Sequence, residues 1–195
     1  EAKRALTCLR EGLRLYQSSQ RPLNLKLASV MCEMGSLLSQ NGEYIDSASF
    51  FKFALHVRKS SLGDSFVVAR NHYSLGVTLA TQEVFSNIST EAFSHFEEAL
   101  RICKQEFEGD NIQASVIIHA MGVLKERKGD FLAASNWFKG ERDMLISLFG
   151  EDHDSVASVS SDLGTCHFNV GKYESARNMF QDTLRIVTQI GRAHV

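Results

Sequence analysis

Residues 151–154 read Glu-Asp-His-Asp and place four side chains of metal-binding type in a row. Adjacent residues rarely turn three ligands toward one ion, because metal sites collect ligands at spacings that let the side chains converge. Acidic groups that precede a helix interact favourably with its unpaired N–H groups and its dipole. We therefore interpret this run as a helix-capping loop and expect no metal site there.

The other candidates for acid–base or nucleophilic chemistry are incomplete. Cys166 and His167 are adjacent, and consecutive helical residues point about 100° apart, so they form a poor nucleophile–base pair. His119 and Glu126 share a helix face, but no nucleophile, oxyanion donor or phosphate-binding loop accompanies them. The sequence also lacks an H-E-x-x-H motif and a P-loop. We expect a protein that is not an enzyme and uses no cofactor.

The composition bounds the class of protein and favours a reducing compartment. The 195 residues are 44% apolar with a formal net charge of −2, which favours a buried core and gives no reason to expect nucleic acid or a membrane as partner. Without a signal-peptide pattern or an apolar run of bilayer length, we expect a cytoplasmic location. Because the first residue is not Met, we expect a fragment of a longer protein. The cysteines, which we interpret as free thiols rather than a disulfide framework, are Cys8, Cys32, Cys103 and Cys166.

Four glycines recur along the chain at intervals of 41, 46 and 42 residues. Self-similarity at such a period is the signature of stacked supersecondary units. The glycines are Gly35, Gly76, Gly122 and Gly164, and the phenylalanines that follow them are Phe51, Phe96, Phe138 and Phe180. Each unit reads as two antiparallel helices, for example over about 27–39 and 44–60, separated by a turn glycine such as Gly42. The repeated glycine allows the helices to approach closely, and the phenylalanine fills the space between them.

The repeats divide the chain into five segments. The apolar stripe of residues 1–19 predicts a helix that ends before Pro22. We therefore assign residues 1–22 to the second helix of an incomplete preceding repeat, and complete repeats to 23–64, 65–110, 111–151 and 152–195. The fold class that we expect is all-α: a right-handed superhelical solenoid of antiparallel helix pairs.

Two features depart from the repeat. The repeat at 65–110 is four residues too long, with the excess at 81–91. Either this is an extra helical turn with Phe85 covering the helix end, or Val84 and Phe85 form an exposed docking knob. In the next repeat Lys125 and Glu141 stand at positions that are usually apolar. They either reach solvent through their stems or pair with each other, and we predict a Lys125–Glu141 contact.

The loop at 148–157 (LFGEDHDSVA) and the leucine–glycine pair at 163–164 resemble those of tetratricopeptide-repeat proteins of the long-period, kinesin-light-chain-like type. Asp154 stands where that family usually has proline. The resemblance covers nearly the whole chain and implies a solenoid that binds peptides, acidic ones around a tryptophan in the kinesin-light-chain relatives. The asparagine pairs that hold peptide backbone in kinesin light chains are absent, and their slots hold Cys32-Glu33, Tyr73-Ser74, His119-Ala120 and Ser161-Asp162.

In such a solenoid the first helix of each pair lines the concave surface. Counted from the repeated glycines, the groove residues that we expect are Arg70, Tyr73, Val77, Thr81, His119, Val123, Arg127, Ser161, Thr165, Phe168 and Asn169. Arginines beside an aromatic suit an extended acidic segment with one large side chain, whereas reading RNA would need a basic lining. We therefore expect a non-enzymatic scaffold or adaptor that binds a peptide segment in this groove. The alternative is a sensor or oligomerisation arm of a larger multidomain signalling protein or enzyme.

Overall fold

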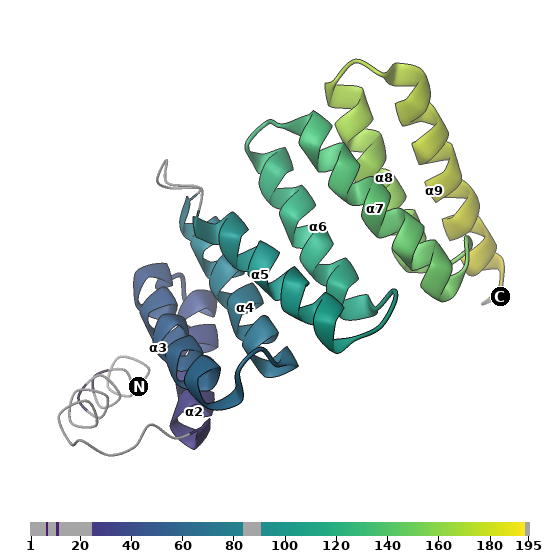
Figure 1. The fold of residues 1–195 in the computed structure, drawn as a ribbon. Helices are drawn as coiled ribbons and strands as arrows, with labels where there is room; N and C mark the ends of the chain where they lie inside the picture. Colours follow the sequence, from purple (N-terminus) through teal and green to yellow (C-terminus); the bar gives the residue numbers. More distant parts are fainter. Residues whose placement is uncertain (1–6, 8–10, 12–24, 84–90, 194–195) are drawn as a thin grey trace.

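A computed structural model describes residues 25–83 and 91–193, together with Thr7 and Glu11. Within residues 25–193 it contains eight α-helices and, among the described residues, no strand (Figure 1). The helices are α2 (Leu25–Gln40), α3 (Tyr44–Leu62), α4 (Phe66–Glu83), α5 (Glu91–Glu106), α6 (Ile112–Arg127), α7 (Phe131–Phe149), α8 (Asp154–Asn169) and α9 (Tyr173–Ala193). The predicted helix over 1–19 and the predicted docking knob at Val84 and Phe85 lie outside the described residues, apart from Thr7 and Glu11, which are helical.

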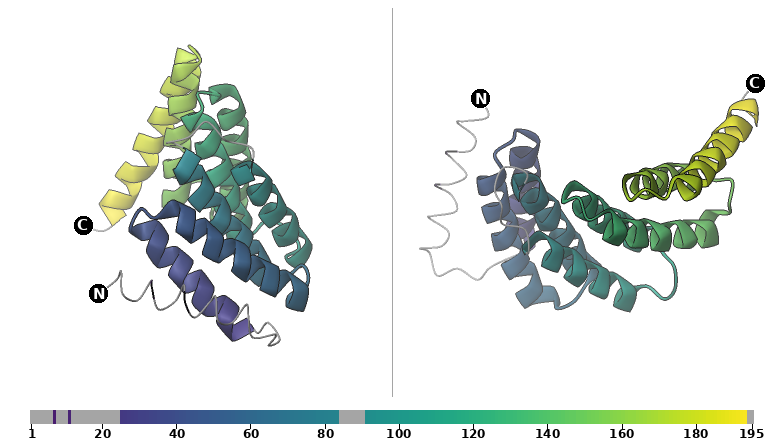
Figure 2. Two further views of the ribbon diagram at one scale, coloured as in Figure 1. Left: turned by 90° about the vertical axis from the view of Figure 1, so that its left-hand side faces the viewer. Right: turned by 90° about the horizontal axis from the view of Figure 1, so that it is seen from above.

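The helices form pairs that stack into a curved array (Figure 2). We call α2, α4, α6 and α8 the first helices and α3, α5, α7 and α9 the second helices. Each first helix packs on the second helix of its own pair, and each second helix packs on the first helix of the next pair. Contacts between α2 and α4 and between α4 and α6 place these first helices side by side. The all-α solenoid of antiparallel pairs predicted from the glycine spacing is confirmed, while the predicted repeat boundaries stay predictions.

Side chains at the helix starts satisfy backbone N–H groups that have no partner within the helix. Asn111 accepts a hydrogen bond from the N–H of Ala114 at 2.8 Å and so caps α6. The imidazole of His153 accepts one from the N–H of Ser155 at 3.2 Å and caps α8. The run at 151–154 is therefore a capping loop, as predicted from its position before a helix.

Each repeated glycine meets the phenylalanine of its own pair. A Cβ atom built at Gly122 would lie 2.6 Å from the ring of Phe138, closer than real Cβ contacts come. The same construction gives 2.7 Å for Gly76 against Phe96, and Gly35 and Gly164 face their phenylalanines in the same way. In all four pairs the ring therefore rests on bare backbone, a contact that we call the Gly–Phe contact. A side chain at the glycine position would push the two helices apart.

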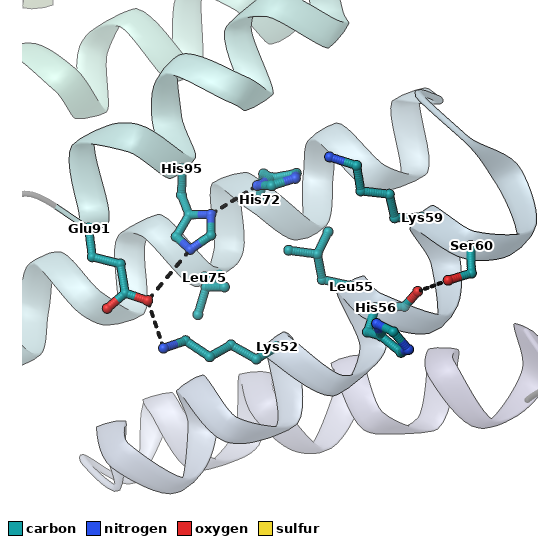
Figure 3. A pocket seen from close by; sticks show the side chains of 9 residues that line it. All are labelled: Lys52, Leu55, His56, Lys59, Ser60, His72, Leu75, Glu91 and His95. Atoms are coloured by element: carbon teal, nitrogen blue, oxygen red, sulfur yellow. Dashed lines mark hydrogen bonds and ion pairs between the residues drawn. The ribbon is translucent and has the colours of Figure 1, made fainter.

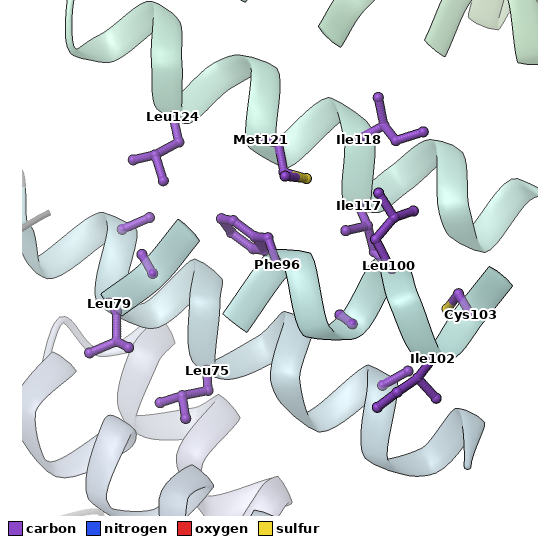
Figure 4. Packing of buried hydrophobic residues seen from close by; sticks show 14 of the residues in the cluster. Leu75, Leu79, Phe96, Leu100, Ile102, Cys103, Ile117, Ile118, Met121 and Leu124 are labelled. Carbon is purple, nitrogen blue, oxygen red and sulfur yellow. The ribbon is translucent and has the colours of Figure 1, made fainter. Parts of the chain in front are cut away.

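The core is continuous along the array rather than gathered at one centre. One cluster of buried side chains extends from α3 to α6, and two smaller clusters fill the space at either end of it. Figure 4 shows the middle of the large cluster, where Met121 and Ile117 of α6 lie over Phe96 and Leu100 of α5. Second helices are thus covered on one side by their own first helix and on the other by the first helix of the next pair. No helix among the described residues is long and apolar enough to cross a membrane.

A pair of histidines interrupts this core in the second pair. The Nδ1 atoms of His72 on α4 and His95 on α5 are 2.9 Å apart, so one ring donates a hydrogen bond to the other (Figure 3). The equivalent positions hold Met31 and Phe50 in the first pair and Ile118 and Trp137 in the third. Burial lowers the pKa of His72 to about 4, helped by His95, while Glu98 and Asp64 oppose the shift and Lys59 adds to it. Burial also lowers the pKa of His95. Both rings are therefore neutral near pH 7.

Substitution of Gly122 by Ala should lower the free energy of unfolding by about 1–3 kcal/mol, because the new methyl group overpacks the space occupied by Phe138. The matched control is Gly140→Ala on α7, where an added Cβ meets nothing within 4 Å. This change removes a helical glycine and should raise the free energy of unfolding by about 0.5–1 kcal/mol. Urea unfolding followed by circular dichroism measures both. Equal effects at the two positions would contradict the Gly–Phe contact.

Acidification should destabilise the array through His72. An unfolded histidine titrates near pH 6.5 and folded His72 near 4, so the unfolded state binds more protons between these values. The contribution of neutral His72 to the free energy of unfolding is therefore fully present above pH 6.5. About 3 kcal/mol of this contribution is lost as the pH falls to 4. The variant His72→Ile should lose this part of the pH dependence, whereas His56→Gln, which alters an exposed histidine of the same surface, should keep it. Urea unfolding at several pH values measures the difference.

Candidate peptide-binding groove

Five of the eleven predicted groove residues line one pocket between α4 and α6. The pocket has a volume of about 240 Å³, and we call it the α4–α6 pocket. The predicted residues in its lining are Val77, Thr81, His119, Val123 and Arg127, and the other lining residues are Ala80, Phe96, Ala120 and Leu124. Most of the lining is apolar, and its polar residues are Thr81 and His119, which are half-buried, and Arg127, which is exposed. Such a site accepts one large apolar side chain and orients it with a few polar contacts.

The remaining predicted residues lie outside this pocket. Arg70 is exposed on α4, and the half-buried ring of Tyr73 packs against Phe96 with its centroid 6.0 Å away. On α8, Thr165 donates its hydroxyl hydrogen to the carbonyl of Ser161, and the Asn169 amide donates to the carbonyl of Thr165. Thr165 and Asn169 thus each donate a hydrogen bond to a carbonyl of their own helix. Arg70, Tyr73, Ser161, Thr165 and Asn169 remain predicted groove residues that lie outside the α4–α6 pocket.

Phe168 faces a different neighbour. Its ring centroid is 5.5 Å from that of Tyr173 on α9, and both rings line a pocket of about 480 Å³ together with Phe180 and Leu184. Because Phe168 lies in the last turn of α8, it projects toward the turn into α9 rather than toward α6. The sequence placed this residue on the correct helix, but the structure assigns it to a separate apolar surface.

Glu141 is buried and is paired with His119 of the groove. The Nδ1 atom of His119 lies 3.0 Å from a carboxylate oxygen of Glu141, and its ring packs against Phe138 at 5.6 Å between centroids. The predicted Lys125–Glu141 contact is therefore wrong. Lys125 instead places its ammonium group 4.6 Å from the ring centroid of Phe93. Six residues separate Lys125 from His119, which is about 240° around the helix axis, so the two side chains cannot face the same neighbour.

The charge around His119 is set by three carboxyl groups. Its hydrogen bond to Glu141 raises the pKa of His119 against the effect of burial, and the nearby Asp162 and Glu126 add to the rise. Burial raises the pKa of Glu126 and Asp162, and Asp162 raises that of Glu126 further. Asp162 and Glu126 thus make the surroundings of His119 acidic, while Arg127, next to Glu126 on α6, acts in the opposite direction and lowers the pKa of Glu126.

The structure gives the surroundings of the candidate catalytic groups. His119 lies within hydrogen-bond distance of Glu141 rather than of Glu126, with which it shares a helix face. Burial raises the pKa of the Cys166 thiol to about 12, with Glu126 and Asp162 contributing, which disfavours the nucleophilic thiolate. Among residues 25–83 and 91–193, no group of three or more His, Cys, Asp or Glu side chains is placed to hold a metal ion. The described cysteines, Cys32, Cys103 and Cys166, are free thiols.

Sequence reasoning missed another pocket, which lies between α3, α4 and α5. It has a volume of about 500 Å³ and lies beside the His72–His95 pair (Figure 3). At this hollow the Nζ atom of Lys52 on α3 lies 2.7 Å from a carboxylate oxygen of Glu91 on α5, and the ion pair links the two second helices. The available signal was the pair of histidines at positions that are apolar in the first and third pairs.

Comparison with known proteins agrees with the solenoid fold. No protein-family profile matches the chain. A stretch of 69 residues, 35% of the chain, is 26% identical to the mitochondrial tetratricopeptide repeat protein 19 homolog of Drosophila melanogaster and spans 19% of that protein. BtubC (BKLC) from P. vanneervenii superposes with a TM-score of 0.79 over 97% of this chain and 74% of its own, at 17% identity. The kinesin-light-chain-like protein of Podosopora anserina, with nearly identical TPR-like repeats, gives 0.78 over 98% and 89% at 12% identity.

The chain has the solenoid fold of tetratricopeptide-repeat proteins. Its fold is the one that the loop at 148–157 and the repeated glycines predicted. A third solved structure, the Rap protein complexed with competence and sporulation factor, superposes with a TM-score of 0.66 over 84% of this chain and 43% of its own, at 14% identity. These identities are low, so the comparisons establish the fold of the chain and say nothing of the residues in its groove.

Replacing Glu141 by Ala should lower the pKa of His119, because the hydrogen bond that favours the protonated imidazole is lost. In the unchanged chain this pair contributes stability that is present below pH 6.5 and is lost as the pH rises through the folded pKa. NMR titration of the His119 ring protons measures the shift. Glu126→Gln is the control and should lower the pKa less, since Glu126 acts only through space. An unchanged His119 titration in Glu141→Ala would contradict the assigned pair.

Proposed function

We propose that this chain is a non-enzymatic scaffold that binds an extended peptide segment of a partner protein along its first helices. The α4–α6 pocket supports this proposal best, because it joins predicted groove residues from two successive pairs at one concave site. A volume of about 240 Å³ suits a single large side chain, which would anchor the peptide. Solenoids of this fold bind peptides elsewhere: the Rap conjugation gene regulator of plasmid pLS20 was solved in complex with the Phr* peptide.

The charges around the pocket define the preferred peptide. Arg127 lines the pocket and is exposed, and Arg70 is exposed on the neighbouring α4. A guanidinium group binds a carboxylate through paired, charge-assisted hydrogen bonds, so acidic residues beside the anchor are favoured. Asp162 and Glu126 repel such residues on the α8 side. The acidic part of the peptide therefore lies toward α4 and its large side chain lies between α4 and α6.

The asparagine pairs of kinesin light chains are missing, so another set of side chains must hold the peptide. Thr81 and His119 provide polar groups at the pocket, although the Thr81 hydroxyl already donates to the carbonyl of Val77 at 2.9 Å. We infer that recognition depends on the anchor and on the arginines more than on the peptide backbone. Specificity then follows from one apolar side chain with carboxylates next to it, rather than from a run of backbone hydrogen bonds.

A displayed library of short random peptides tests the site. Binders should contain one large apolar or aromatic residue flanked by acidic residues. Arg127→Glu and Arg70→Glu should each weaken the best binder about tenfold or more by charge reversal, and Val123→Trp should do the same by filling the pocket. Fluorescence anisotropy with the labelled peptide measures the affinity.

Lys139→Glu on α7 is the matched control, because it makes the same charge change at an exposed position away from the groove. Its affinity for the peptide should equal that of the unchanged chain. Circular dichroism of each variant establishes that the helices are intact. Unchanged affinity in both Arg127→Glu and Val123→Trp would remove the α4–α6 pocket as the binding site.

A further inference from the structure

The pocket between α3, α4 and α5 contains a buried polar atom without a partner. His72 is 6% exposed and lines this pocket, which we call the His72 pocket. Its Nδ1 atom is bonded to His95, but its Nε2 atom is buried and has no hydrogen-bond partner among the described residues. Figure 3 shows this nitrogen turned toward the side of the pocket that carries the ammonium group of Lys59. An unpaired ring nitrogen inside a protein costs free energy, so this atom needs a partner from outside the described chain.

The fourth pair shows how a polar group at this position is satisfied within the chain. Ser160 on α8 and His72 on α4 each stand four residues before the repeated glycine. The hydroxyl of Ser160 accepts a hydrogen bond at 2.9 Å from the guanidinium group of Arg142 on α7. Arg142 stands four residues after the repeated phenylalanine, and the residue at that position on α3 is Leu55, which has no group to donate. The second pair therefore has the buried polar group and lacks the side chain that would bind it.

The pocket also has room for a ligand. The position of His95 is occupied in the third pair by Trp137, a larger side chain that packs against the core cluster with its ring centroid 6.0 Å from that of Phe93. The smaller imidazole ring of the second pair lies beside a pocket of about 500 Å³. Pockets that bind small molecules commonly measure about 300–1,000 Å³.

Two lysines give the lining of the pocket a net positive charge. Lys52 and Lys59 both line it, and Glu91, which pairs with Lys52, is the one carboxylate among its described lining residues. The Nζ atom of Lys59 lies 3.4 Å from a carboxylate oxygen of Glu98, and exposed ion pairs of this kind contribute little to stability. Arg101 donates two hydrogen bonds of 2.8 Å to Glu98. That carboxylate therefore keeps a partner when Lys59 turns to an anion in the pocket.

We propose that the His72 pocket binds a phosphoryl group, with the Nε2 atom of His72 at its base and the ammonium group of Lys59 as its counter-charge. The ring that donates in the His72–His95 bond decides whether this Nε2 atom is a donor or an acceptor. A phosphoryl monoanion carries an O–H group as well as charged oxygens, so it can pair with either form. An ionised carboxylate can only accept, and two lysines disfavour a cation.

The ligand is either a small phosphate monoester or the phosphorylated side chain of another protein. The His72 pocket and the α4–α6 pocket share no lining residue, so this site is independent of the proposed peptide groove. NMR titration of the histidine ring signals of the whole 195-residue chain tests it. The probes are inorganic phosphate and a short, otherwise uncharged peptide that contains one phosphoserine, and sodium chloride at matched ionic strength is the control.

The ring signals of His72 and His95 should shift to saturation with phosphate or with the phosphopeptide and should not follow the chloride control. Tighter binding of the phosphopeptide than of phosphate assigns the ligand to a protein side chain. Equal or tighter binding of phosphate assigns it to a small phosphate ester. Shifts equal to those in sodium chloride for both probes would overturn the proposal.

Substitutions separate this pocket from a general attraction of anions. Lys59→Gln should weaken phosphate binding about tenfold or more, because the counter-charge is lost. His72→Ile, which introduces the residue type of the third pair at this position, should weaken it as much, with the His95 ring as the reporter. Lys139→Gln, at an exposed lysine of α7, is the matched control and should bind like the unchanged chain. Unchanged affinity in both Lys59→Gln and His72→Ile would contradict the assigned site.

Discussion

A phenylalanine ring that rests on a glycine backbone sets the distance between the two helices of each pair. The contact recurs in all four described pairs, and in three of them an added Cβ would come within 2.8 Å of the ring. Phe51, Phe96 and Phe138 also lie in the core clusters that include the first helix of the next pair, so in these three pairs the same contact helps to set the spacing between pairs. The width of the α4–α6 pocket, whose lining includes Phe96, therefore depends on it. Even the second pair, with its longer connection, keeps Phe96 against Gly76.

The middle of the array replaces apolar packing with titratable groups. His72 is held neutral inside the second pair, and His119 is drawn toward its charged form by Glu141 in the third. His72 therefore binds a proton less readily in the folded chain than in the unfolded chain, and His119 binds one more readily. Their contributions to stability change with pH in opposite directions. Because His119 also lines the pocket, protonation there adds positive charge next to Arg127. Under the proposed function, stability and peptide recognition would thus depend on pH in neighbouring pairs.

Much of this fold could be predicted from the sequence because its determinants are local and repeated. Glycine and phenylalanine at fixed spacing predict where helices pair, and the first predicted pair, at 27–39 and 44–60, is observed at 25–40 and 44–62. The pocket residues on α4 and α6 followed from counting along a helix. Counting could not give the partners across helices: Glu141 faces His119 rather than Lys125, and His72 meets His95 from 23 residues away. Nor could it give the contact of Phe168, in the last turn of α8, with Tyr173 at the start of α9.

The central claim is that stacked pairs held at the Gly–Phe distance form a groove on their first helices that receives a peptide from another protein. NMR spectra of the labelled chain, recorded with and without a selected peptide, test this claim most directly. The account predicts that the backbone signals of Val77, Thr81, Val123 and Arg127 shift together, with small changes on α3 and α7. Shifts confined to the second helices, or to the exposed face of α9, would contradict it.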